Sequence, residues 1–273
     1  MKIFGIDISA HQNSFDFKRA KKEGIKFVII RGAYAGVKDS RFEVNYQKAH
    51  ANGLDVGVYL YSMAENEKEA KREAELLYKN CLKGKRFEYP IYYDVEDKIQ
   101  KKLGKKKMDA IIRTFCNTLE KKGYYVGVYS NLDFYKNYCN GATLAKRYTW
   151  WLAYWGGYLP KVEGSIEMWQ FGGETNALRT NLIAGVVCDQ DYALSNLKQK
   201  IKEKGKNGYK KEIKKQNTEV YCVVKKGDTL SAIATKYKTT IQKLIVLNQT
   251  SYPKIKTSKG NFIQVGWRIL IKR

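Results

Sequence analysis

Eight short apolar runs recur along the first two-thirds of this 273-residue chain, and this repeat limits the possible folds more than any other feature. Most early runs are followed by a segment with apolar residues at helical spacing, as Ile111, Ile112, Phe115 and Leu119 are in residues 108–122. Short strands that alternate with amphipathic helices predict an α/β fold of the (β/α) barrel type. The eight runs are residues 3–9, 27–32, 56–62, 89–96, 124–131, 149–155, 166–172 and 185–192.

The connections between the last runs differ from the earlier ones. Residues 156–164 are too few and too rich in glycine for a helix, and residues 173–184 have the character of a loop or a hairpin. We therefore expect an irregular barrel whose final strands lack covering helices.

Polar and aromatic residues gather where the predicted strands end, and barrel enzymes carry their chemistry at the C-terminal ends of strands. Asp94 and Glu96 lie two residues apart, so in a strand they point to the same face. Mutual repulsion and burial raise the pKa of one carboxyl group in such a pair and keep it protonated near neutral pH. A proton donor beside a carboxylate is the equipment of glycoside hydrolysis, and surrounding aromatic rings suit stacking on sugars.

The other strand ends supply the remaining candidate site residues. Asp7 and Asp189 come from the first and last strands, which are adjacent where a barrel closes. Periodicity does not separate Asp189 from Asp191, because both point to one face of the strand. The candidates for substrate binding are Arg31, Tyr59, Tyr61, Tyr129, Asn131, Trp155 and Gln170.

The chain has 51 lysine and arginine residues against 27 acidic residues, which gives a net charge of +24. Such a charge favours a polyanionic partner: nucleic acid, an anionic membrane or a bacterial wall with phosphate polymers. No zinc finger, helix-turn-helix or RNA-binding motif accompanies the charge, and no apolar run approaches the roughly 18 residues of a membrane helix. We therefore expect neither nucleic-acid binding nor membrane insertion.

Cofactor chemistry is not expected either. Five scattered cysteines and two histidines argue against a metal site, a disulfide framework and a histidine-dependent nucleophile. The first residues reach Asp7 too early for the apolar segment of a signal peptide, so we expect synthesis in the cytoplasm.

The composition changes after residue 196. Residues 197–219 are rich in lysine and keep an apolar period for only a few turns, which predicts the last helix of the barrel fraying into a basic linker behind a catalytic barrel of residues 1–196. Residues 220–273 predict a small strand-helix-helix-strand (βααβ) unit, with Thr229 opening the first helix and Thr239 or Thr240 the second. A unit this small suits a binding role.

Seven motifs follow one another along residues 1–196 in a specific order and spacing. They are Gly5-Ile6-Asp7-Ile8-Ser9, Gly57-Val58-Tyr59-Leu60-Tyr61, Tyr93-Asp94-Val95-Glu96, Val128-Tyr129-Ser130-Asn131, Trp151-Leu152-Ala153-Tyr154, Trp169-Gln170-Phe171 and Val187-Cys188-Asp189. In these motifs the chain resembles glycoside hydrolase family 25, the Chalaropsis-type lysozymes found in many phage endolysins. It departs from the family at Leu60, where histidine is frequent, and at residues 31–34, where an acidic Glu-Gly motif is frequent.

The resemblance implies an N-acetylmuramidase that hydrolyses the β-1,4 bond between N-acetylmuramic acid and N-acetylglucosamine without a cofactor. In that reaction Glu96 is the general acid, and Asp94 stabilises positive charge on the muramic residue, either directly or through its 2-acetamido group. Asp7 and Asp189 add negative potential and bind hydroxyl groups. The carboxyl groups of Asp94 and Glu96 are expected to lie roughly 5 to 7 Å apart. This distance leaves retention, inversion and a substrate-assisted route open.

Residues 221–234, Leu247-Asn248 and residues 265–269 resemble a LysM module. Such modules bind glycans that contain N-acetylglucosamine, here through the loop of Gly227, Asp228, Thr229 and Leu230. Residues 251–262 are longer than the usual pattern. The partner implied is bacterial peptidoglycan, with anionic wall polymers as further candidates, and we expect the protein to act on the cell wall after release from the cytoplasm. These features favour a phage endolysin; a bacterial autolysin of the same activity and a wall-binding protein without turnover are the alternatives. No oligomeric state is predicted.

Overall fold

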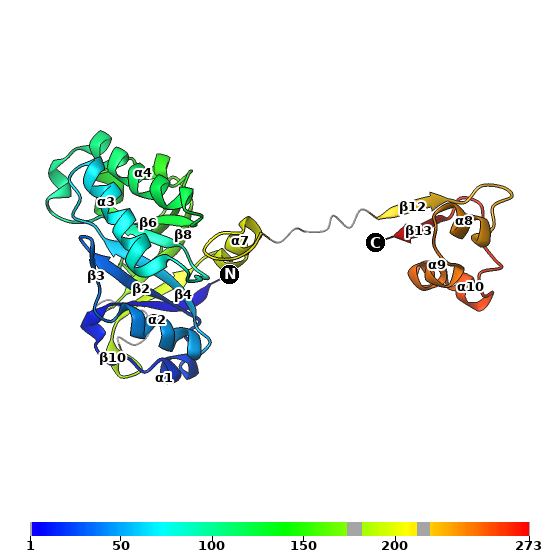
Figure 1. Cartoon of the computed structure of the whole chain (residues 1–273), viewed down its shortest axis with the longest axis horizontal. Coiled ribbons are helices and arrows are strands. Elements are labelled where there is room, and N and C mark those ends of the chain that lie inside the picture. The colour runs from blue at the N-terminus through cyan, green and yellow to red at the C-terminus, as the bar shows by residue number, and fades with distance from the viewer. Residues whose placement is uncertain (1, 174–181, 212–218, 273) are drawn as a thin grey trace. The chain divides into compact units, whose positions relative to one another are not determined.

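The computed structural model describes residues 2–173, 182–211 and 219–272 (Figure 1). The chain divides into two compact units, Met1–Glu212 and Ile213–Arg273. Among the described residues, no helix combines the length and the apolar character needed to cross a membrane.

Eight strands of the first unit form a closed barrel, so the predicted α/β barrel is confirmed. The order around the barrel is β1-β11-β8-β7-β6-β5-β4-β2, and the pairing of β1 with β2 closes it. A short strand, β3 (Val37–Lys38), pairs with the end of β2 as a hairpin. The barrel strands are β1 (Ile3–Ile8), β2 (Phe27–Tyr34), β4 (Asp55–Tyr61), β5 (Ile91–Asp94), β6 (Val126–Asn131), β7 (Thr149–Ala153), β8 (Ile166–Gly172) and β11 (Asp189–Ala193).

Helices fill the connections between the early strands. In α4 (Lys105–Lys121), Met108, Ile111, Phe115 and Leu119 recur at helical spacing and are all buried, so one apolar stripe packs against the barrel. No helix lies between β7 and β8, as expected. The other helical segments of this connecting set are η1 (Ala10–Gln12), α1 (Phe17–Lys22), α2 (Phe42–Ala51), α3 (Glu67–Leu77), η2 (Tyr78–Leu82), η3 (Gln100–Lys102), α5 (Leu132–Asn137) and α6 (Gly141–Leu144).

The last barrel strand differs from its prediction. The predicted run 185–192 is wrong at its start, because Val186–Val187 forms β10, which pairs with β9 (Leu182–Ile183). Strand β11 begins at Asp189 and is antiparallel to both neighbours, β1 and β8, whereas the other barrel pairings are parallel. Antiparallel neighbours need no covering helix between them. The start of β11 therefore lies at the rim where the other strands end.

Alternation along the strands separates an interior cluster from an outer one. Rings of Phe27, Tyr89, Tyr92 and Trp151 fill the interior, while the opposite faces of the strands pack under the helices. Glycines on neighbouring strands leave room for these rings: a Cβ atom at Gly127 would lie 2.4 Å from Cε1 of Tyr92. Because the period is two residues, the interior positions that follow toward the rim include the predicted site residues.

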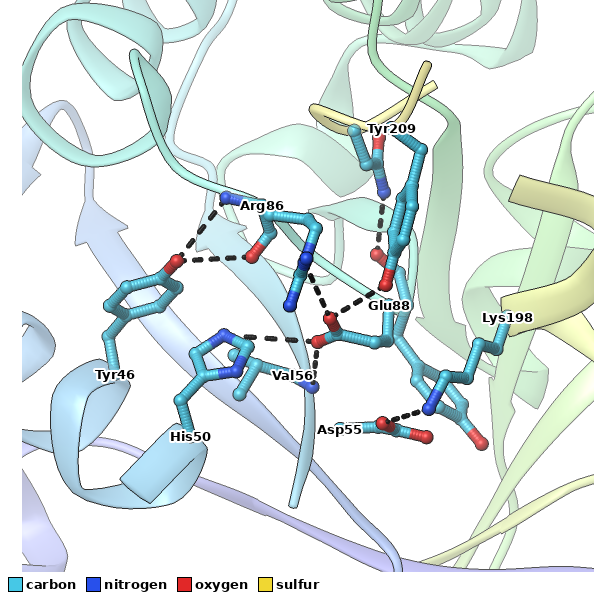
Figure 2. Close-up of polar contacts among 10 residues, drawn as sticks. Tyr46, His50, Asp55, Val56, Arg86, Glu88, Lys198 and Tyr209 are labelled. Carbon is cyan, nitrogen blue, oxygen red and sulfur yellow. Dashed lines mark hydrogen bonds and ion pairs between the residues drawn. The ribbon is translucent and has the colours of Figure 1, made fainter. Parts of the chain in front are cut away.

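The segment 197–211, predicted as a fraying last helix and assigned to the linker, belongs to the barrel unit. It begins with α7 (Leu197–Lys204), whose Leu197 joins the interior cluster. The Tyr209 hydroxyl donates to Oε1 of the buried Glu88 at 2.8 Å, and Lys198 Nζ lies 2.6 Å from Asp55 Oδ1 (Figure 2). Asp55 starts β4, so the segment covers the N-terminal ends of the strands. The prediction missed this because the segment is rich in lysine and has few apolar residues, of which Leu197 and Ile201 are buried. The rest of the predicted linker, residues 212–218, lies outside the described residues.

The second unit has the predicted βααβ order with one additional short helix. Thr229 caps α8 by accepting a hydrogen bond from the backbone of Ala232, and Thr240 caps α9 in the same way through Lys243. The added helix, α10, lies in the long stretch noted in the sequence. The elements are β12 (Val220–Val223), α8 (Leu230–Lys236), α9 (Ile241–Asn248), α10 (Pro253–Thr257) and β13 (Arg268–Lys272), with β12 antiparallel to β13.

Candidate active site

The two central carboxyl groups stand at the end of β5. Asp94 is its last residue and only 4% exposed, and its Oδ1 atom has no hydrogen-bond partner among the described residues. Glu96 follows two residues later, is partly exposed, and its Oε2 accepts a hydrogen bond from Asn131 Nδ2 at 3.3 Å. Of the two groups, Glu96 is the one open to a ligand.

A cavity of about 710 Å³ lies beside Glu96, within the size range of small-ligand sites. Its walls come from the ends of β6, β7 and β8, the start of β11 and the helix α5. Six predicted site residues line it: Glu96, Tyr129, Asn131, Trp155, Gln170 and Asp189. The sequence reasoning missed the other lining residues, which are Leu132, Asp133, Lys136, Ala153 and Tyr154.

Three aspartates gather where β1 meets β11. Asp7 and Asp189 are register partners, and Asp191 lies opposite Gly5, one step deeper. Asp189 is partly exposed and lines the cavity. Asp191 is fully buried, and its Oδ1 accepts a hydrogen bond from Trp151 Nε1 at 2.7 Å. The geometry therefore places Asp189 rather than Asp191 against the cavity.

Gln170 connects this aspartate group to the aromatic wall. Its amide Nε2 donates to Asp7 Oδ2 at 2.9 Å, while its Oε1 accepts from the Tyr129 hydroxyl at 3.0 Å and from Trp155 Nε1 at 3.3 Å. Three contacts fix which way the amide points. Gln170 therefore orients Asp7 and both aromatic side chains together.

Three carboxyl groups of the site, those of Glu96, Asp94 and Asp7, have higher pKa values than solvent-exposed carboxyl groups. Burial raises the pKa of Glu96, and the hydrogen bond from Asn131 opposes that rise. Burial also raises the pKa of Asp94 well above its usual value; repulsion from Glu96 adds to the effect and the charge of Arg31 opposes it. For Asp7, burial is again the largest cause of a strongly raised pKa, followed by repulsion from Asp189. Such shifts suit groups that donate a proton near neutral pH.

Arg31 and Tyr59 lie beside the acids but do not line the cavity. Arg31 Nε is 2.7 Å from Oδ2 of Asp39, and the same oxygen accepts a hydrogen bond from the backbone of Ala10. Sequence reasoning missed Asp39, which lies in a connection and belongs to no motif. Tyr59 packs edge-on against Trp151.

Tyr61 stands on the other side of Asp94 from the cavity. Its hydroxyl donates to Asp97 Oδ2 at 3.0 Å, and its ring stacks on that of Tyr34. Neither Tyr34 nor Asp97 was predicted as a site residue. The described part of the chain contains no cluster of three or more histidine, cysteine, aspartate or glutamate side chains suited to a metal ion.

In the second unit, three of the four predicted glycan-binding residues line a cavity of about 270 Å³. Thr229 caps α8, Leu230 is buried beneath the loop, and Asp228 accepts a hydrogen bond from the backbone of Lys225. Gly227 does not line the cavity, but its φ of 93° supplies the turn that leads into it. The other walls are Ser231, Ile241, Lys259, Gly260, Asn261 and Ile263.

Comparison with known proteins gives two family matches: residues 6–178 match the family "Glycosyl hydrolases family 25", and residues 222–272 match "LysM domain". The autolytic lysozyme of Clostridium acetobutylicum is 30% identical over 178 residues, which are 64% of this chain and 52% of that protein. The chain therefore spans about half the length of that relative.

Two solved structures share the fold at comparable identity. The CTP1L endolysin is 25% identical with a TM-score of 0.62, and the match covers 74% of this chain and 70% of that one. The modular autolysin LytC of Streptococcus pneumoniae, solved with a synthetic peptidoglycan ligand, is 27% identical with a TM-score of 0.59, over 70% of this chain and 46% of that one. The chain belongs to glycosyl hydrolase family 25, and its C-terminal unit is a LysM domain.

Proposed function

We propose that this chain is an N-acetylmuramidase that hydrolyses the β-1,4 bond between N-acetylmuramic acid and N-acetylglucosamine in bacterial peptidoglycan. The observation that carries the proposal is the position of Glu96. It is a carboxyl group with a raised pKa that lines the cavity, and Asp94 lies two residues before it, at the end of β5.

Glu96 acts as the general acid and protonates the oxygen of the leaving N-acetylglucosamine. As the bond breaks, positive charge develops on the muramic residue, and Asp94 stabilises it directly or by holding the 2-acetamido group as an internal nucleophile. That charge favours the ionised form of Asp94, against the burial that raises its pKa. The charge of Arg31 also favours the ionised form, since it lowers the pKa of Asp94. A water molecule then bonds to the anomeric carbon and gives up one proton to the carboxyl pair, which restores the protonated Glu96.

The residues around the pair bind and orient the sugar chain. Asp189 and Gln170 line the cavity and offer acceptors and a donor to hydroxyl groups. Asp7 is held in place by Gln170, and the charge of Asp97 adds to the burial that raises the pKa of Glu96 and keeps its proton on. The rings of Tyr129 and Trp155 form an apolar wall for sugar faces.

The LysM domain adds a second attachment to the same polymer. Binding of N-acetylglucosamine-containing strands would raise the local concentration of the barrel on the wall. The net charge of +24 favours walls that also carry anionic polymers. We propose a role in bacterial lysis as an endolysin; the same chemistry would also serve an autolysin, and both an endolysin and autolysins are among the similar proteins.

The test is the identity of the new reducing ends released from purified peptidoglycan. Muramic acid at the new end supports the proposal. N-acetylglucosamine at that end would assign the cleft to the other glycosidic bond and overturn it. No new reducing ends, with the protein still bound to the wall, would mean a wall-binding protein without turnover.

A further inference from the structure

A pair of stacked tyrosines forms a flat surface at the barrel rim. The rings of Tyr34, at the end of β2, and Tyr61, at the end of β4, lie 4.9 Å apart with an angle of 10° between their planes. Tyr61 therefore covers one face of the Tyr34 ring. Tyr34 is nevertheless 44% exposed, so its outer face and edge are open to solvent. An open aromatic face of this kind is a surface on which another flat ring can stack.

The local backbone holds this surface in place. After Tyr34 the chain turns through Ala35 and Gly36, with φ values of 46° and 84°, into β3. Two consecutive positive φ values are those of a tight two-residue hairpin turn, and Ala35 adopts this conformation although it has a Cβ atom. The Ala35 amide also donates to the Tyr61 carbonyl at 2.9 Å. The turn and the stacked ring are therefore tied to the same strand end.

Tyr61 is fixed from its other end as well. Its hydroxyl donates to Oδ2 of Asp97, whose Oδ1 accepts a hydrogen bond from the backbone of Ile99. A surface that is already ordered loses little conformational entropy when a ligand stacks on it. The tyrosine pair is therefore ordered before a ligand binds.

The tyrosine pair and the cavity lie on opposite sides of the acids. Around the barrel, β5 with Asp94 stands between β4, which carries Tyr61, and β6, which opens the cavity wall. In register, Tyr61 is the partner of Asp94 on one side and Tyr129 is its partner on the other. A glycan strand that fills the cavity and passes Glu96 would therefore continue over the tyrosine pair.

We infer that the Tyr34–Tyr61 pair is a saccharide subsite that binds an N-acetylated pyranose ring of the glycan strand, beyond the scissile bond from the cavity. This inference rests on the proposed glycan-cleaving function. Stacking on the open ring adds contact with the strand without touching the reacting atoms.

The test measures binding of a soluble hexasaccharide of alternating N-acetylglucosamine and N-acetylmuramic acid by calorimetry. The protein is the full chain with Glu96→Gln, so that the sugar is not cut, and the LysM domain is present in every variant. We expect Tyr34→Ala and Tyr34→Leu each to weaken the barrel-dependent binding about ten-fold, and Tyr34→Phe, which keeps the ring, to stay within two-fold. Thermal melting identifies any variant that has lost its fold, and using both Ala and Leu leaves a second variant for the comparison.

Two results would overturn the subsite: unchanged binding in folded Tyr34→Ala or Tyr34→Leu, or an equal loss in Tyr34→Phe. The proposed function is tested separately by reducing-end release from the wild-type chain. If the wild type cleaves peptidoglycan but substitutions at Tyr34 leave binding unchanged, only the proposed subsite is contradicted. If the wild type does not cleave peptidoglycan but binding still depends on Tyr34, the proposed muramidase activity is contradicted and the subsite is supported.

Discussion

Asp7 and Asp189 lie directly opposite each other across β1 and β11, the antiparallel strands that complete the barrel. Their pairing brings two acidic residues from the two ends of the barrel sequence to one rim, beside the cavity that Glu96 lines. Asp191, one step deeper, adds a third carboxyl group. A cluster of this kind costs folding free energy, since buried carboxylates repel one another, and its presence at the rim fits a role in the reaction.

Replacing Gln170 with leucine removes the amide that joins Asp7 to Tyr129 and Trp155. We expect turnover on peptidoglycan to fall about 100-fold, because Asp7 loses its donor and two aromatic side chains lose their shared acceptor. Reducing-end release measures the effect. Gln47→Leu, on the exposed face of α2, is the matched control and should keep full activity. Equal activity of the two variants would contradict the role of Gln170.

Asp191→Asn should stabilise the barrel most at neutral pH. Burial raises the pKa of Asp191 well above the value of 3.8 expected for an exposed side chain. In the unfolded chain the carboxyl group loses its proton first, so stability falls as the pH rises from about 4 toward the folded pKa. Asparagine cannot ionise and still accepts the hydrogen bond from Trp151.

The measurement for Asp191→Asn is the melting temperature at pH 7 and at pH 4. We expect a gain of about 2–4 °C at pH 7, which corresponds to about 1 kcal/mol for a unit of this size, and a smaller gain at pH 4. A gain that is larger at pH 4 would show that the pKa of Asp191 is not raised in the folded chain.

Asn207→Ala should weaken the barrel without changing its chemistry. Asn207 is fully buried, accepts a hydrogen bond from the Tyr125 amide at 2.7 Å and donates to the Tyr89 carbonyl at 2.8 Å. Alanine leaves both backbone groups without these partners and is unfavourable at a φ of 56°. We expect a loss of about 2–4 kcal/mol in chemical denaturation, with normal turnover at low temperature. Unchanged stability would mean that segment 197–211 does not hold the barrel.

Much of the barrel is readable from its sequence, because each strand carries an apolar face toward the helices and each early connection has helical spacing. The direction of β11 is not readable in this way: Asp189 and Asp191 alternate identically whichever way the strand runs. Asp39 escaped prediction because its partner Arg31 is eight residues away in sequence and only the folded chain brings them together. The linker was predicted to start too early, at residue 197, because charge dominates segment 197–211, while the buried Leu197, Ile201 and Asn207 anchor it to the barrel.

Removing the LysM domain after Glu212 should separate wall binding from chemistry. On intact walls we expect activity at low enzyme concentration to fall about 10- to 100-fold, because the second attachment is lost. On soluble glycan fragments the rate should stay the same. If activity falls equally on intact walls and on soluble fragments, the LysM domain is needed for the activity of the barrel itself and does not act by binding the wall.

The central claim is that Glu96 donates the proton that cleaves the glycan. The most direct measurement is the initial rate of reducing-end release from purified peptidoglycan by the wild type, Glu96→Gln and the exposed control Glu65→Gln, across a range of pH. Activity of the wild type should fall as the pH rises through the raised pKa of Glu96, since the acid must be protonated to act. We predict that Glu96→Gln loses about 10²- to 10⁴-fold while still binding the wall, and that Glu65→Gln matches the wild type. Turnover by Glu96→Gln within ten-fold of the wild type would contradict the account.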